Sequence, residues 1–85
     1  MYKMQFIKTD TQEILREVDY EKPDIINSII EQFEEERVTD AFLMDSRKRL
    51  FKADYVTYSV VGSNVYRFFF KVKLHDVQPM LARRN

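Results

Sequence analysis

Residues 50–74 read LFKADYVTYSVVGSNVYRFFFKVKL, and this stretch decides the expected fold because it predicts a long β-hairpin. The two arms, residues 50–61 and 65–74, are rich in β-branched and aromatic residues, which favour strands. Between them, Gly62-Ser63 is typical of a two-residue type II′ turn, in which glycine supplies the positive φ of the first central position.

The length of the turn sets which side chains share a face of this hairpin. With two residues in the turn, one face pairs Tyr66, Phe68, Phe70 and Val72 with Ser59, Thr57, Tyr55 and Ala53. The other face pairs Arg67, Phe69, Lys71 and Lys73 with Tyr58, Val56, Asp54 and Lys52. Asp54 opposite Lys71 is favourable and Lys52 opposite Lys73 is repulsive, each by about 0.2–1 kcal/mol. A three-residue turn shifts the pairing by one and removes both pairs.

Upstream of the hairpin, Ala41-Phe42-Leu43-Met44 is a short apolar run between Asp40 and Asp45. Such a run predicts an interior strand that is covered on both faces. We expect residues 46–49, which include Arg47, Lys48 and Arg49, to form the loop between this strand and the hairpin.

A single amphipathic helix is expected before that strand. Pro23-Asp24 is typical of a helix start, since proline is tolerated in the first turn and an acidic side chain faces the positive end of the helix dipole. The apolar residues that follow recur on one side of a helix that should end near Val38; they are Ile25, Ile26, Ile29, Ile30 and Phe33.

At the N-terminus, alternation of apolar and polar residues from Tyr2 to Phe6 predicts a half-buried strand. Thr9-Asp10-Thr11 predicts a turn, and residues 13–20 a second strand, although Ile14, Leu15 and Val18 also fit one side of a short helix. We therefore expect one α+β domain over residues 1–85, in the order β-β-α-β-β-β. Its sheet is mainly antiparallel with the helix on one face, and residues 77–85 form a short helix or a loose tail.

Composition excludes several classes of protein. The chain has 85 residues, of which 45% are hydrophobic, and it has no cysteine, so disulfides and thiolate metal sites are excluded. No stretch approaches the length of a membrane span, and no signal-peptide pattern opens the chain. We expect a cytoplasmic protein without a membrane partner.

Charge is balanced overall and uneven along the chain. Basic and acidic residues number 14 each, so the formal net charge is zero. Residues 1–20 hold three basic and four acidic side chains (net −1), and residues 21–45 hold two and eight (net −6). Residues 46–85 hold nine basic and two acidic side chains (net +7). This asymmetry bears on partners and self-association.

The sequence shows no catalytic motif, since one glycine cannot build a phosphate-binding loop or a nucleophile elbow. His75 beside Asp76 is the only histidine, and no nucleophile is placed for it to activate. Glu31, Glu34 and Glu35 share one side of the helix, which is typical of a solvated acidic face. We therefore expect no enzyme, no cofactor, no metal and no small-molecule substrate.

Our first hypothesis is a protein-interaction module that self-associates through the uncovered face of the sheet, as a homodimer, or that binds another protein. One helix covers one face of the sheet, and 12 aromatic residues cannot all avoid the other. The expected contacts are Tyr55, Tyr58, Tyr66 and Phe69. In general appearance the chain resembles the small accessory proteins of bacteria and phages.

The alternative hypothesis is a nucleic-acid-binding protein, because Phe69 lies among cations on one strand face and bases stack on such rings. Interleaved basic and aromatic residues also occur in strands without a ligand. The expected contacts are Arg47, Lys48, Arg49, Lys52, Arg67, Phe69, Lys71 and Lys73. A third hypothesis is an inhibitor whose acidic helix, with Glu34-Glu35-Glu36, imitates a phosphate backbone.

Overall fold

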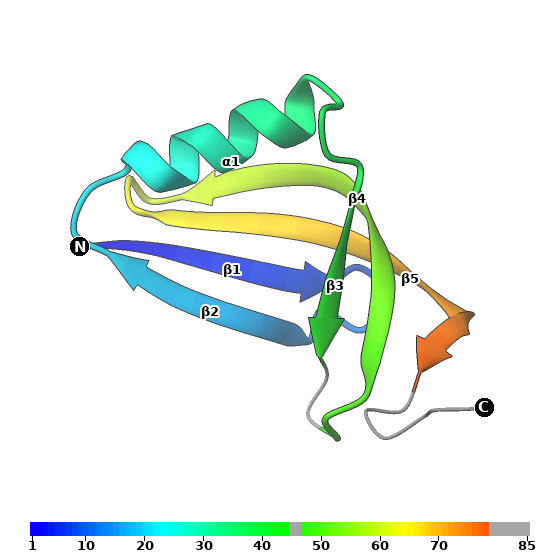
Figure 1. Cartoon of the computed structure of the whole chain (residues 1–85). Coiled ribbons are helices and arrows are strands. Elements are labelled where there is room, and N and C mark those ends of the chain that lie inside the picture. The colour runs from blue at the N-terminus through cyan, green and yellow to red at the C-terminus, as the bar shows by residue number, and fades with distance from the viewer. Residues whose placement is uncertain (45–46, 79–85) are drawn as a thin grey trace.

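The computed structural model describes residues 1–44 and 47–78, without the side chains of Phe51 and of residues 73–78. Within these ranges the chain forms a small α+β domain with five strands and one helix (Figure 1). In chain order the elements are β1 (Tyr2–Lys8), β2 (Ile14–Tyr20), α1 (Asp24–Glu34), β3 (Asp40–Met44), β4 (Leu50–Val61) and β5 (Val65–Gln78). The predicted order β-β-α-β-β-β is confirmed.

The sheet is mixed, with the strand order β2-β1-β5-β4-β3. β1 and β5 are parallel, whereas β1–β2, β3–β4 and β4–β5 are antiparallel. Residues 14–20 form a strand and not the alternative short helix, because they pair with β1 over its whole length. β4 and β5 are long and bent, and the two edge strands β2 and β3 approach each other (Figure 1).

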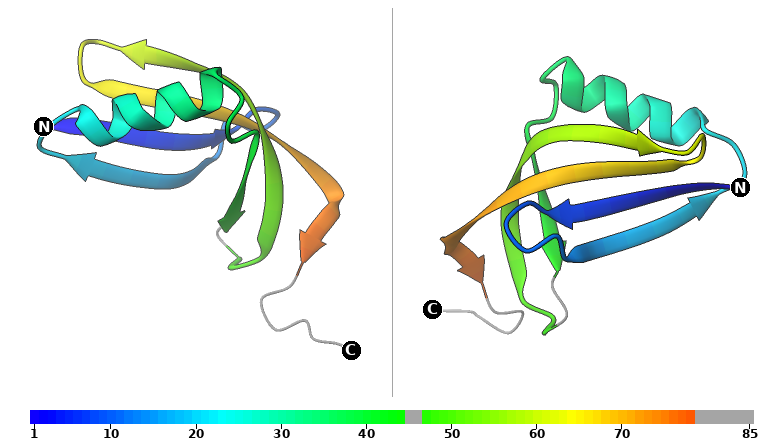
Figure 2. Two further views of the ribbon diagram at one scale, coloured as in Figure 1. Left: turned by 45° about the horizontal axis from the view of Figure 1, so that its top comes forward. Right: turned by 180° about the vertical axis from the view of Figure 1, so that it is seen from behind.

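α1 lies over one face of the sheet (Figure 2). Ile26 and Phe33 are buried and Ile29 and Ile30 partly so, but Ile25 is 53% exposed. The apolar stripe that contacts the sheet is therefore narrower than the sequence predicted.

The helix ends at Glu34 and not near Val38. Glu36 adopts a left-handed conformation with φ of 59°, and its N–H donates to Phe33 O at 3.1 Å. The next N–H, that of Arg37, donates to Gln32 O at 2.9 Å. These two hydrogen bonds form a Schellman-type C-cap, which stops the helix before the predicted end.

The core lies between α1 and the sheet, and its centre is aromatic. Phe68 is fully buried, and its ring centroid lies 5.7 Å from that of Phe6 and 6.0 Å from that of Phe33. Phe70 packs against the same two rings at 5.0 and 5.6 Å. The other buried members of this cluster are Met4, Ile26, Leu43 and Ala53.

The β4–β5 turn differs from the prediction because the loop contains three residues, Gly62-Ser63-Asn64. Val61 pairs with Val65, so Tyr66 lies opposite Val60 and Phe68 opposite Tyr58. Glycine is still needed, since Gly62 has a φ of +66°. The one-residue shift places Tyr58 on the α1 side of the sheet, whereas the predicted register placed it with Phe69 on the other side.

A β-bulge at Val56 then restores the predicted register farther from the turn. The register shifts between Tyr55 and Thr57, and beyond this point Tyr55 faces Phe70 and Asp54 faces Lys71, as predicted. A second shift lies between Phe51 and Ala53, with Phe51 opposite Val77. The predicted Lys52–Lys73 pair is therefore wrong.

β3 is an edge strand and not the predicted interior strand. Leu43 points into the core and is 4% exposed, whereas Phe42 is 66% and Met44 38% exposed. The reason is that α1 covers only one face of the sheet. β5 continues to Gln78, past the predicted end at Leu74, and residues 79–85 of the predicted tail lie outside the described residues.

Two neighbouring isoleucines of α1 provide a test of this packing. Ile26→Ala removes a fully buried side chain, so we expect it to lower the free energy of unfolding by about 2–5 kcal/mol. Ile25→Ala makes the same chemical change at an exposed position, where the effect should stay within about 0.5 kcal/mol. Urea denaturation followed by circular dichroism measures both, and equal losses would contradict the described packing.

Candidate interaction surfaces

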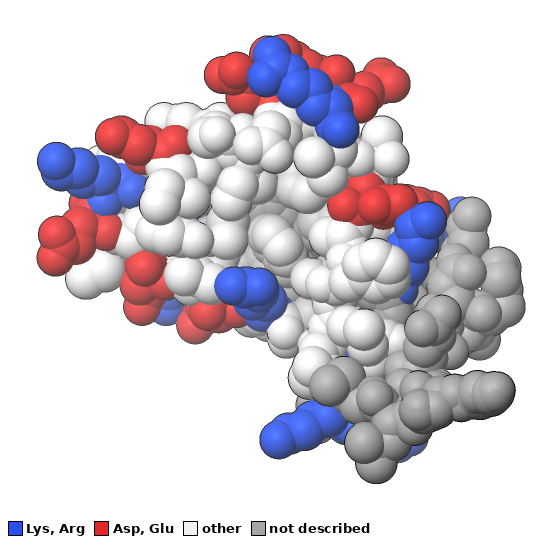
Figure 3. Space-filling view, viewed as in Figure 1, with Lys and Arg blue, Asp and Glu red and all other residues white. Residues whose placement is uncertain are grey.

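The acidic side chains of α1 and the basic side chains of the β3–β4 loop lie at opposite ends of the molecule. Figure 3 shows red acidic side chains gathered over α1 at the top, whereas the β3–β4 loop with Arg47, Lys48 and Arg49 lies at the other end. At the top, Arg37 forms ion pairs with Glu35 at 2.6 Å and Glu31 at 3.9 Å. The helix acids are therefore partly neutralised by a cation of their own segment.

The sheet face away from α1 is largely polar. On β1 and β2, Lys3 lies 3.6 Å from Glu17, and Gln5 Nε2 donates to Glu17 Oε2 at 2.7 Å. The hydrogen bond from Gln5 lowers the pKa of Glu17, and the charge of Lys3 acts in the same direction. This half of the face is therefore hydrogen-bonded and ion-paired within the molecule.

Opposite charges also lie close together on β3, β4 and β5, in the other half of this face. Lys52 Nζ lies 3.2 Å from Asp40 Oδ2, and Lys71 lies opposite Asp54 in the β4–β5 register. Two of the predicted nucleic-acid contacts, Lys52 and Lys71, thus face carboxylates of the same chain.

Phe69 lies on this face with Arg67, as predicted from the alternation of β5. The Arg67 guanidinium carbon is 5.6 Å from the centroid of the Phe69 ring, within reach of a cation–π interaction. Phe69 itself is only partly exposed. The remaining predicted cation on this strand, Lys73, has its side chain outside the described residues.

The predicted basic contacts therefore form two groups, one in the β3–β4 loop and one on the sheet face. Arg47, Lys48 and Arg49 are exposed in the loop, and Lys48 has a φ of 61°. Because β4 is long and bent, this loop lies at the other end of β4 from the β4–β5 turn (Figure 1).

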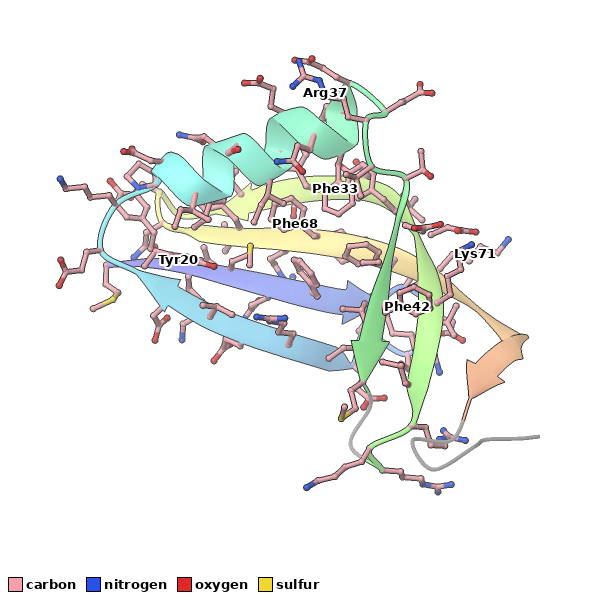
Figure 4. The ribbon with its side chains drawn as sticks, in the orientation of Figure 1. Tyr20, Phe33, Arg37, Phe42, Phe68 and Lys71 are labelled. Atoms are coloured by element: carbon pink, nitrogen blue, oxygen red, sulfur yellow. The ribbon has the colours of Figure 1, made fainter. Side chains whose placement is uncertain are left out.

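The predicted interaction residues do not form one surface. Tyr55, Tyr58 and Tyr66 are partly buried on the α1 side, where they pack against the core, and Phe69 lies on the opposite face. Tyr58 is stacked on Phe68, with ring centroids 6.0 Å apart. Figure 4 shows Phe33 and Phe68 in the layer between α1 and the sheet.

Tyr55 joins β4 to the C-terminal end of α1. Its ring stacks on Phe33 at 4.5 Å, and its hydroxyl donates to Glu34 Oε2 at 2.5 Å. Burial raises the pKa of Tyr55 well above its ordinary value, and the Glu34 carboxylate raises it further. This tyrosine therefore serves the packing of α1 on the sheet.

An apolar hollow lies where the two edge strands approach each other. It has a volume of about 300 Å³ and is lined by Leu15 and Arg16 of β2 and by Phe42, Leu43, Met44 and Leu50 of β3 and β4. Figure 3 shows a broad uncharged surface on this side of the molecule, below α1. Sequence reasoning missed this surface, because it joins residues from opposite ends of the strand order.

A second apolar feature is the outer edge of β4 beyond Asp54. β3 pairs with β4 only as far as Asp54, and Tyr55 N–H donates to Thr39 O at 2.9 Å. Past this point, no strand of the described ranges pairs with that side of residues 56–61 (Figure 2). Val56, Val60 and Val61 are 53%, 44% and 50% exposed. The only sequence signal for this edge is the absence of charge from residue 55 to residue 66.

The described residues contain no group of three or more histidine, aspartate or glutamate side chains placed to hold a metal ion. In the same part of the chain, no helix has the length and apolarity needed to cross a membrane.

A hollow of about 350 Å³ at the end of α1 is lined by Phe33, Glu34, Glu36, Thr39, Tyr55 and Val56. The side chains of His75 and Asp76 lie outside the described residues.

No protein-family model matches this sequence, and neither the curated proteins nor the solved structures contain a significantly similar chain.

The raised pKa of Tyr55 predicts a loss of stability at alkaline pH. The folded state keeps the Tyr55 proton at pH values where the unfolded chain, with an ordinary pKa of 10.0, releases it. The stabilisation is therefore complete below pH 10, and the free energy of unfolding should fall as the pH rises above about 10. Urea denaturation at about pH 8 and about pH 11 measures this fall. Tyr55→Phe should reduce it and the control Tyr2→Phe should not; an unchanged fall in Tyr55→Phe contradicts the assignment.

Proposed function

We propose that the chain is a non-enzymatic protein-interaction module that self-associates. The observation that supports this proposal is the distribution of exposed apolar side chains along the boundary of the sheet. Val56, Val60 and Val61 follow the outer edge of β4, and Phe42 and Met44 border the hollow at β3. Exposed apolar side chains favour an interface, because burying them against another polypeptide removes them from water.

The sheet boundary, and not the sheet face away from α1, is the proposed contact region. That face carries the Lys3–Glu17 and Lys52–Asp40 ion pairs, and its aromatic residue Phe69 lies beside Arg67. Covering these charges with a partner requires their desolvation, which offsets much of the gain from pairing. Residues 56–61 at the edge of β4 carry no charge, and the nearest acidic side chains are Glu34 and Glu36, which line the hollow beside Val56.

Self-association is measured by sedimentation equilibrium or light scattering across a wide range of protein concentration. We expect the apparent mass to rise reversibly from one chain of 10.3 kDa towards two, without weakening at higher salt. An apparent mass of one chain at every concentration, up to the solubility limit, contradicts the proposal.

The second candidate is nucleic-acid binding, favoured by the position of Arg47, Lys48 and Arg49 at the end of the molecule away from α1. Lys52 and Lys71 support it less, since both face carboxylates. The third hypothesis, an acidic helix that imitates a phosphate backbone, is likewise weakened because Arg37 pairs with Glu31 and Glu35.

A gel-shift assay with single-stranded RNA separates the second candidate from self-association. If the loop binds phosphates, complexes form at about 50 mM salt and their affinity falls linearly with the logarithm of salt concentration. Replacing Arg47, Lys48 and Arg49 by Gln should then abolish the shift. The control Lys8→Gln should retain it. Absence of a shift in the unaltered protein at about 50 mM salt excludes this candidate.

A further inference from the structure

We infer that two copies of this chain pair antiparallel through the outer edge of β4, about a two-fold axis at Tyr58. The inference rests on the proposed self-association and names its interface. The joined sheet runs from β5 and β4 of one copy into β4 and β5 of the other.

The backbone of this edge is available for such pairing. An unpaired strand edge presents N–H and C=O groups that a further strand can bind. Within the described residues, the outer side of 56–61 has no strand neighbour, and α1 lies over the sheet face (Figure 2). A second copy of the same edge satisfies these groups in both molecules.

The other two edges of the sheet carry features that oppose pairing. The outer strand β2 contains Arg16, Glu17 and Asp19, and charged side chains on an edge discourage further strands. The other outer strand, β3, has only five residues and begins with Asp40. Residues 56–61 of β4 contain no charged side chain.

The side chains of the edge are self-complementary, which identifies a second copy as the partner. Residues 56–60 read Val-Thr-Tyr-Ser-Val, nearly the same sequence in both directions. Antiparallel pairing centred on Tyr58 places Thr57 opposite the partner's Ser59 and Val56 opposite the partner's Val60. Valine pairs, hydroxyl pairs and aromatic pairs are the cross-strand combinations that stabilise antiparallel sheets.

On each face of the joined sheet, side chains of the same kind from the two copies lie side by side. Val56 lines the hollow at the end of α1, and Tyr58 packs against the core on the α1 side of the sheet. Val60 lies on the same side because it is paired with Tyr66. The hydroxyl-bearing Thr57 and Ser59 are exposed on the other side. Pairing thus forms an apolar row on the helix side and a hydroxyl row on the polar side. The bulge at Val56 marks the end of the paired segment.

Charge sets the salt dependence of this dimer. A two-fold axis perpendicular to the sheet places both α1 helices on the same face, and each belongs to a segment with net charge −6. Salt screens their mutual repulsion, with a Debye length of about 8 Å at 0.15 M. The dissociation constant of the dimer therefore stays constant or falls as the salt concentration rises. The dissociation constant of a nucleic-acid complex rises instead.

Cysteine cross-linking tests the register, and the natural chain has no cysteine to interfere. Thr57→Cys and Ser59→Cys are prepared separately and then mixed under mild oxidation. Directly opposed residues lie about 4.5–5.5 Å apart between Cα atoms, within the range for a disulfide. Diagonal pairs lie about 7–8 Å apart, at or beyond its limit. We expect the mixed sample to cross-link and each variant alone to cross-link several-fold less.

A matched pair of lysine substitutions tests the edge independently. Val60→Lys places a charge opposite the partner's Val56, and we expect it to raise the dissociation constant about tenfold or more. Ile14→Lys makes the same change at a β-branched residue of similar exposure on β2, 48% against 44%, and should leave the constant unchanged. Circular dichroism verifies that both variants fold.

The outcomes separate the interface from the proposed function. A dimer of the unaltered chain that is insensitive to Val60→Lys, or that cross-links equally in the mixed and single samples, overturns the β4 interface and leaves self-association standing. A chain that stays monomeric at every concentration overturns both. A dimer lost in Val60→Lys, retained in Ile14→Lys and cross-linked only in the mixed sample supports the β4 interface.

Discussion

The parallel pairing of β1 with β5 is the interaction on which the rest of the fold depends. It joins the N-terminal hairpin to the C-terminal hairpin by setting residues 3–8 beside residues 65–70. Two-stranded hairpins are marginally stable alone, and here the central pairing joins the β1–β2 hairpin to the three strands β3, β4 and β5 in one sheet. It also places Phe6 beside Phe68 and Phe70, and Phe33 of α1 then packs onto Phe68 and Phe70. Without this pairing, Phe6 of β1 would no longer pack against Phe68 and Phe70 beneath α1.

The interaction surfaces follow from covering such a sheet with one short helix. α1 ends at Glu34 in a Schellman-type cap, and the chain then turns into β3, whose five residues pair only with the first part of β4. The long second part of β4 is therefore left as an edge. The same shortage of covering elements leaves Phe42 and Met44 exposed beside the hollow. The apolar side chains at the boundary of the sheet are thus exposed because one short helix and a five-residue β3 do not cover them.

The acidic and basic residues that cancel in the net charge of the chain are partly in contact and partly apart in the structure. Part of the cancellation occurs by contact, since Asp40 meets Lys52 and Asp54 lies opposite Lys71. Acidic side chains gather over α1, whereas Arg47, Lys48 and Arg49 lie in the β3–β4 loop at the other end of the molecule. The contacts reduce the basic surface that a nucleic acid could use.

Local signals in the sequence determined the order of the elements, the start of α1, the hairpin around Gly62 and the shared face of Arg67, Phe69 and Lys71. These features depend on residues close together in the chain, such as proline, glycine and alternating side chains. The tertiary structure alone decided the parallel β1–β5 pairing, the edge position of β3 and the side on which Tyr58 lies. The last of these follows from one extra residue in the turn and one bulge at Val56, each of which reverses the face of every side chain beyond it. The uncharged run at residues 55–66 is visible in the sequence, but the absence of a neighbour for its outer edge is not. Whether a strand has a neighbour depends on contacts between distant segments, which no local pattern encodes.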